Sequence, residues 1–79
     1  MDSVEEIILE CVEEITFKKV AIDEPLYTTN IIDSMGTVDL AVLLQQRFDI
    51  TIDASDIIED NFNSVALLKA YIQKRLDSE

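Results

Sequence analysis

The sequence of 79 residues predicts an all-α domain with three main helices, one short helix and a long loop after the first helix. Three segments carry apolar residues at steps of three and four, which is the period of one buried helix face. Residues 49–53 alternate polar and apolar side chains, but the chain offers no second strand to pair with them, and we expect a loop there. A chain of this length builds one small core, and we expect a single domain over residues 1–79.

The first helix is expected over residues 3–17, capped by Ser3 or by Asp2. Its apolar face consists of Val4, Ile7, Ile8, Cys11, Val12 and Ile15, and glutamates occupy the other side. A reactive thiol needs an electropositive setting, whereas Cys11 lies among glutamates. We therefore expect Cys11 to be a core residue.

A long loop is expected over residues 20–33, which show no helical period and contain Pro25. Loops of this length in a small domain usually serve a function, and the apolar residues of this one are expected to anchor it to the core. Asn30 is expected to adopt a left-handed turn, which asparagine tolerates better than most residues.

The last third of the chain is expected to form a short third helix at about residues 55–60, with Ile57 or Ile58 turned inward. Asn63 is then expected to cap a fourth helix over residues 64–76. The buried stripe of this fourth helix is expected to consist of Val65, Leu68, Tyr71, Ile72 and Leu76.

The second helix is expected over residues 34–48, with Ser34 as its N-cap and the charge of Asp33 at the positive end of the helix dipole. Its sequence contains two apolar stripes on different faces. One consists of Leu40, Ala41, Leu43, Leu44 and Phe48, and we expect it to be core. The other consists of Met35, Val38 and Val42, and we expect it to be exposed, the alternative being that these three residues also belong to the core.

The composition is strongly acidic, with 17 Asp and Glu against 6 Lys and Arg and a formal charge of −11. Such a field repels phosphate backbones and anionic lipids and attracts basic protein surfaces. We expect a monomer with basic protein partners, no nucleic acid and no membrane insertion. No signal peptide is recognisable and the single cysteine cannot form an internal disulfide, which predicts a cytoplasmic protein.

The usual residues of catalysis are missing, because the chain has no histidine and Gly36 is its only glycine. General bases, nucleophile pairs and phosphate-binding loops therefore have no candidates, and we expect no enzymatic activity. One acidic cluster consists of Asp53, Asp56, Glu59 and Asp60. Its spacing is not that of an EF-hand loop, and we expect solvated surface charge and no metal site.

The run Asp33-Ser34-Met35 resembles the signature of acyl and peptidyl carrier proteins, with Asn30-Ile31-Ile32 before it, where many members begin with glycine. The resemblance extends over almost the whole chain, from the acidic first helix to Phe48-Asp49 at the end of the second helix and Tyr71-Ile72 in the last one. It implies the acyl-carrier-like four-helix bundle.

The same resemblance implies that a phosphopantetheinyl transferase moves 4′-phosphopantetheine from coenzyme A onto Ser34. The terminal thiol of this arm would carry acyl or aminoacyl groups as thioesters to biosynthetic enzymes. Asp33 would help the transferase hold its magnesium ion. Partner enzymes would bind beside the arm, at the surface formed by Met35, Val38, Asp39 and Val42.

The run Asp-Ser-Met-Gly-Thr-Val looks most like D-alanyl carrier proteins or aminoacyl and peptidyl carriers of natural-product clusters, which are loaded by an adenylating ligase. Carriers of fatty-acid synthesis, loaded by an acyltransferase, usually have a carboxylate-rich second helix, whereas this chain has Gln45, Gln46 and Arg47. A fatty-acid carrier remains one alternative. A cofactor-free helical adaptor that binds through Met35, Val38 and Val42 is the alternative from another class.

Overall fold

The computed structural model describes residues 3–29 and 31–78 and contains only helices and loops in that part of the chain. The helices are α1 (Ser3–Thr16), α2 (Ser34–Phe48), α3 (Glu59–Phe62) and α4 (Val65–Ser78), with a single 3₁₀ turn, η1 (Ala54–Asp56), before α3. The prediction of an all-α fold is confirmed. The expected cap at Asp2 and the expected turn at Asn30 lie outside the described residues.

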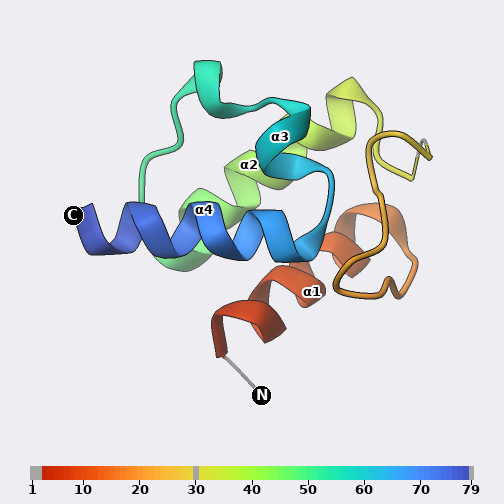
Figure 1. Cartoon of the computed structure of the whole chain (residues 1–79), viewed down its shortest axis with the longest axis horizontal. Coiled ribbons are helices and arrows are strands. Elements are labelled where there is room, and N and C mark those ends of the chain that lie inside the picture. The colour runs from red at the N-terminus through yellow and green to blue at the C-terminus, as the bar shows by residue number, and fades with distance from the viewer. Residues whose placement is uncertain (1–2, 30, 79) are drawn as a thin grey trace.

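Helix α1 packs against both α2 and α4, and the short α3 packs against α4 (Figure 1). The loop between α1 and α2 runs along one side of this arrangement, at the right of Figure 1. The core consists of Ile8, Cys11, Val12, Leu26, Ile32, Leu40, Ala41, Leu44, Ile50, Ile52, Phe62, Val65, Leu68 and Ile72. None of the described helices is long and apolar enough to cross a membrane.

Helix α1 buries Ile8, Cys11 and Val12 of the predicted face, and the other members of that face, Val4, Ile7 and Ile15, are half-buried. Glu5, expected on the solvent side with the other glutamates, is also buried, and its Oε2 lies 3.9 Å from Nζ of Lys69. Cys11 is fully buried, which confirms its interpretation as a core residue, and this burial raises the pKa of its thiol to about 11. The helix ends at Thr16, one residue earlier than expected, because Phe17 takes a left-handed φ of 60°.

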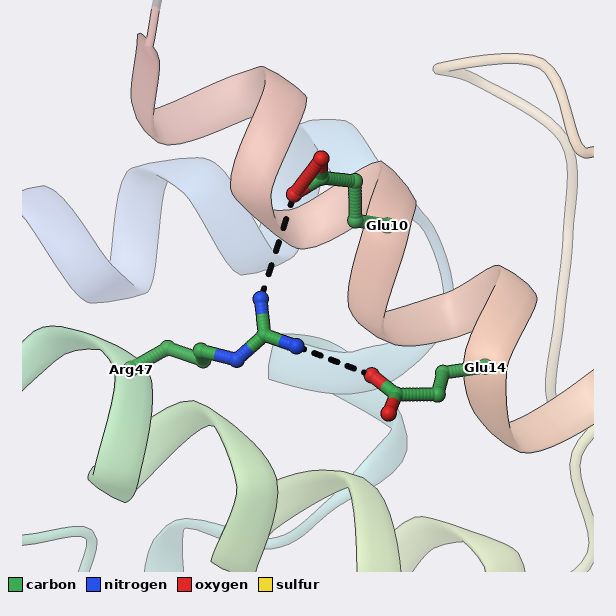
Figure 2. Close-up of polar contacts among 3 residues, drawn as sticks. All are labelled: Glu10, Glu14 and Arg47. Carbon is green, nitrogen blue, oxygen red and sulfur yellow. Dashed lines mark hydrogen bonds and ion pairs between the residues drawn. The ribbon is translucent and has the colours of Figure 1, made fainter.

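Arg47 on α2 joins that helix to α1 through two glutamates (Figure 2). Its Nη2 lies 3.0 Å from Oε2 of Glu14 and its Nη1 lies 3.8 Å from Oε2 of Glu10. All three side chains are partly open to solvent, where such pairs contribute at most about 1 kcal/mol. Arg47 also lies in the last turn of α2, where its charge faces the negative end of the helix dipole.

The long loop is anchored to the start of α4, as its apolar residues predict, with Leu26 fully buried. The Leu26 amide donates to the Asn63 carbonyl at 2.7 Å, and the amides of Tyr27 and Thr28 donate to Oδ1 of Asn63 at 2.9 and 3.2 Å. Asn63 is therefore not the cap of α4, which was the expectation. Ser64 takes that place, since its Oγ accepts from the Leu67 amide at 3.1 Å.

The third helix differs from the expectation, because the segment of residues 55–60 is split between η1 and the start of α3. Asp53 caps the 3₁₀ turn by accepting from the amide and the hydroxyl of Ser55, and these bonds lower the pKa of Asp53. Ile57 is half-buried against the core, Ile58 is exposed, and the fully buried residue of this region is Phe62. The loop expected at residues 49–53 is present, with Ile50 and Ile52 as its buried residues.

Helix α4 buries Val65, Leu68 and Ile72, whereas Tyr71 is half-buried and Leu76 is exposed. The expectation for Leu76 was therefore wrong, because it lies in the last turns of α4, where no other element covers it fully. The hydroxyl of Tyr71 donates to Oδ2 of Asp56 at 2.8 Å. Partial burial, reinforced by this carboxylate, raises the pKa of Tyr71 to about 12.

Candidate functional site at the start of helix α2

The cap of α2 is Asp33 and not Ser34, which corrects the expectation for this helix end. Asp33 has extended backbone angles, and its Oδ1 accepts from the Gly36 amide at 2.7 Å. A carboxylate at this position satisfies a backbone donor and also faces the positive end of the helix dipole. Ser34 is therefore the first residue inside the helix, and its hydroxyl is not needed for capping.

Ser34 is exposed, and its Oγ makes no hydrogen bond within the described part of the chain. The first amides of a helix have no acceptor in the helix itself, and together with the dipole they favour an anion at this end. A phosphodiester on Ser34 would therefore find partial positive charge beside it. The site fits a phosphate-linked group, because the hydroxyl is free, accessible and placed at a helix N-terminus.

Thr37 fixes the capping residue Asp33 through two hydrogen bonds to its backbone. Its side chain is buried, and its Oγ1 and its amide donate to the Asp33 carbonyl at 2.8 and 2.9 Å. Sequence reasoning did not single out this residue. The signal was a threonine four residues after an aspartate, which is the spacing of a hydroxyl that bonds back to a helix carbonyl.

Gly36 allows the end of α1 and the loop to lie close to the start of α2. A Cβ on this residue would lie 3.2 Å from Oδ1 of Asp33, 3.4 Å from Cγ2 of Ile32 and 3.8 Å from Cγ2 of Ile15. The first of these distances is tighter than ordinary contact, so a side chain here would push on the capping carboxylate. Glycine thus keeps the cap and the neighbouring serine in their places.

The two stripes of α2 lie where the sequence predicts them. Leu40, Ala41 and Leu44 are buried, whereas Met35, Val38 and Val42 are 77%, 51% and 47% exposed. We call Met35, Val38 and Val42 the α2 patch. Asp39 is also exposed. The alternative that the patch belongs to the core is thereby excluded, and its role in partner binding stays a prediction.

The acidic cluster at the third helix does not form a metal site in the described residues, where no group of three or more acidic, cysteine or histidine side chains could hold an ion. Asp53 and Asp56 are engaged instead with Ser55 and Tyr71. The carboxylate of Asp33 keeps its Oδ2 free of hydrogen bonds within residues 3–29 and 31–78.

Comparison with known proteins decides between the two classes left open by the sequence. Residues 6–72 match the family described as phosphopantetheine attachment site. The chain belongs to this family. It is therefore a carrier protein with a covalent 4′-phosphopantetheine, and the adaptor alternative is excluded. When bound, this group supplies a terminal thiol that holds acyl or aminoacyl groups as thioesters.

Three relatives of this carrier protein share the name D-alanyl carrier protein. The protein of Streptococcus sanguinis is 41% identical over 59 residues, which are 72% of this chain and 75% of that protein. The protein of Streptococcus suis is 40% identical over 63 residues, 77% of this chain and 80% of that protein. The protein of Lactobacillus delbrueckii is 39% identical over 57 residues, 72% of this chain and 71% of that protein.

Proposed function

We propose that this chain is a D-alanyl carrier protein whose 4′-phosphopantetheine is attached to Ser34, and that it is not itself a catalyst. The observation that carries the attachment site is the free, exposed hydroxyl of Ser34 beside a cap made by its neighbour. The shared name of the relatives supports D-alanine as the cargo. The absence of histidine supports a carrier that does not catalyse a reaction itself. The proposed attachment and loading reactions use coenzyme A and ATP, which favours a cytoplasmic location.

In the attachment step, the Ser34 Oγ attacks the phosphorus of coenzyme A that bears the pantetheine. The bond from this phosphorus to the nucleotide phosphate breaks, 3′,5′-ADP leaves, and the hydroxyl proton is lost to a base of the transferase. Asp33 can take part without losing its cap, because Oδ1 bonds to the Gly36 amide while Oδ2 is free within the described residues. A free carboxylate oxygen is a suitable ligand for the magnesium ion of the transferase.

The α2 patch lies in the same helix as Ser34 and gives a partner an apolar surface beside the arm. Exposed apolar side chains at the centre of an interface contribute most of its binding energy. Asp39 adds a carboxylate next to Val38, which suits a basic residue at the rim. We take the partner at this surface to be an adenylating ligase that activates D-alanine with ATP, which the shared name of the relatives supports.

The attachment site is tested by intact mass after incubation with coenzyme A, magnesium and a broad-specificity phosphopantetheinyl transferase. Wild type should gain the mass of one phosphopantetheine, and Ser34→Ala should gain none while its helical circular dichroism stays unchanged. An unmodified wild type, or modification that persists in Ser34→Ala at Ser55 or Ser64, would contradict the assignment.

The cargo is tested by offering the holo protein either to a D-alanine-activating ligase with ATP or to a malonyl transferase. We expect faster loading by the ligase. An acyltransferase of fatty-acid synthesis would bind carboxylates along α2, and this chain has Gln45 and Gln46 there instead. Val38→Asp should slow the ligase, since it places a charge in the apolar patch. Faster malonyl loading that Val38→Asp leaves unchanged would overturn the cargo and the patch together.

A further inference from the structure

Phe17 is the most exposed large apolar residue of the described chain, at 89%. The other two phenylalanines are covered, since Phe62 is buried and Phe48 is half-buried. Phe17 also has a left-handed φ of 60°, which is unfavourable for a bulky side chain and is usually left to glycine. The chain thus keeps an aromatic ring in solvent at a position where glycine would be more stable, which points to a use for the ring.

The backbone around Phe17 is held by hydrogen bonds. The Phe17 amide donates to the Glu13 carbonyl at 2.7 Å and closes the end of α1. On either side, Oγ1 of Thr16 donates to the Val12 carbonyl at 2.8 Å and accepts from the Lys18 amide at 3.2 Å. A ring that is already fixed at its backbone loses less freedom when a partner binds it, which favours affinity.

Phe17 lies at the same end of the molecule as Ser34. Ile15 lies two residues before Phe17, and Gly36 lies two residues after Ser34. A Cβ on Gly36 would lie 3.8 Å from Cγ2 of Ile15, so the end of α1 and the start of α2 are close together. Figure 1 shows this end at the right, where the orange end of α1 and the yellow-green start of α2 are found. An enzyme that acts on the arm can therefore reach the ring as well as the α2 patch.

A shallow cleft of about 180 Å³ lies beside this end of α1 and is lined by Leu9, Glu10, Glu13, Lys19 and Val20. Its apolar walls suit the stem of a lysine or arginine side chain. The Glu13 carboxylate, which makes no ion pair within the described residues, suits the charged head, whereas Glu10 already lies 3.8 Å from Arg47 and Lys19 adds one positive charge to the wall. Glu13 connects the two features, because its carbonyl also accepts the Phe17 amide. With a formal charge of −11, a second copy of the chain is a poor occupant, and a basic protein is a good one.

We propose that Phe17 is an aromatic anchor for the adenylating ligase that charges the arm, with a basic side chain of the ligase beside Glu13 in this cleft. This inference rests on the proposed function and adds a second contact on α1 to the one expected on the α2 patch. The ring would fill an apolar pocket of the ligase, as aromatic residues do at the centres of protein interfaces.

The test compares holo wild type, Phe17→Gly and Phe17→Ala as substrates of a D-alanine-activating ligase, with KM for the carrier as the readout. Both variants should raise KM about tenfold and leave kcat unchanged. Phe17→Gly should also raise the thermal midpoint by about 4 to 8 °C, because it relieves the left-handed strain. A residue with only a structural role would not combine better stability with weaker binding.

Two matched controls accompany these variants. Leu76→Ala removes an exposed apolar residue near the end of α4, at the opposite side of Figure 1, and should leave KM unchanged. Glu13→Gln should raise KM more than Glu6→Gln, which removes the same charge from α1 outside the cleft. An unchanged KM in both Phe17 variants would overturn the anchor and leave the proposed function standing, whereas failure of the ligase to load wild type would overturn both.

Discussion

Leu44 and Val38 lie six residues apart on α2, one on the buried face and one on the exposed face. The free energy of unfolding lost on truncating each side chain tests this division of the helix. Leu44 is fully buried, so Leu44→Ala removes three carbon atoms from the core. At about 0.8 kcal/mol per buried carbon, the transfer cost alone is about 2.4 kcal/mol, and the cavity left behind brings the expected loss to about 2–5 kcal/mol. For a chain of 79 residues the total stability is about 4–12 kcal/mol, so this loss is a large fraction of it.

Val38 is about half exposed, and Val38→Ala removes two carbons that leave no cavity. Half of the same transfer cost is about 0.8 kcal/mol, and the better helix propensity of alanine offsets part of it. The expected loss is therefore below about 1 kcal/mol.

Urea unfolding followed by far-ultraviolet circular dichroism measures both losses, with equal slopes as the check that the unfolded states are comparable. Similar losses at the two positions would refute the division of α2 into a core face and an exposed patch. A loss at Leu44 below about 1 kcal/mol would refute its place in the core.

Three further predictions concern the contacts around this helix. Asn63→Ala should lower the free energy of unfolding by about 1–3 kcal/mol and speed hydrogen exchange at the Tyr27 amide, because the amides of Tyr27 and Thr28 lose their acceptor; unchanged exchange would contradict the anchoring of the loop. Arg47→Gln should cost less than about 1 kcal/mol, and the cost should shrink in added salt, whereas a large, salt-insensitive loss would contradict a solvent-exposed pair. The pKa of the Cys11 thiol is 9.0 in the unfolded chain and about 11 in the folded one, so the free energy of unfolding should fall as the pH rises from 9 to 11. Cys11→Ala should lack this part of the fall, and an equal pH dependence of the two proteins would contradict the burial of Cys11.

The strongly periodic segments could be predicted from the sequence because one helix face decides them. The core stripe of α1 and the two faces of α2 follow directly from steps of three and four residues. The carrier family could also be predicted, since a short motif and its place after a long loop are both visible in the chain, and attachment at Ser34 stays a prediction.

The helix ends were predicted less well, because neighbouring polar residues compete for the same backbone donors. At the start of α2 both Asp33 and Ser34 can cap, and the carboxylate is the one that reaches the Gly36 amide. At the start of α4 the roles are shared differently: Ser64 caps, while Asn63 serves the distant amides of Tyr27 and Thr28. Contacts between residues 35 or more positions apart leave no local pattern to read.

Other parts of the site depend on tertiary structure in the same way. The close approach of Gly36 to Ile15 and the left-handed backbone of Phe17 follow from how α1 ends against the start of α2. Neither is visible as a period or a motif. The short third helix was displaced for a related reason, since the buried anchor of its region is Phe62, and Ile57 and Ile58 lie between η1 and α3.

The depth of Cys11 has a consequence for the purity of the carried cargo. A second nucleophilic sulfur on the same small protein would interfere with the cargo in two ways. It could accept the acyl group from the arm, or it could form a disulfide with the free thiol of the arm. Thiolate is the reacting form of cysteine, and raising the pKa from 9.0 to about 11 makes it about a hundredfold scarcer near neutral pH. Because Cys11 is also fully enclosed, self-acylation is suppressed twice, and thiol-directed labels added to the folded holo protein report on the arm alone.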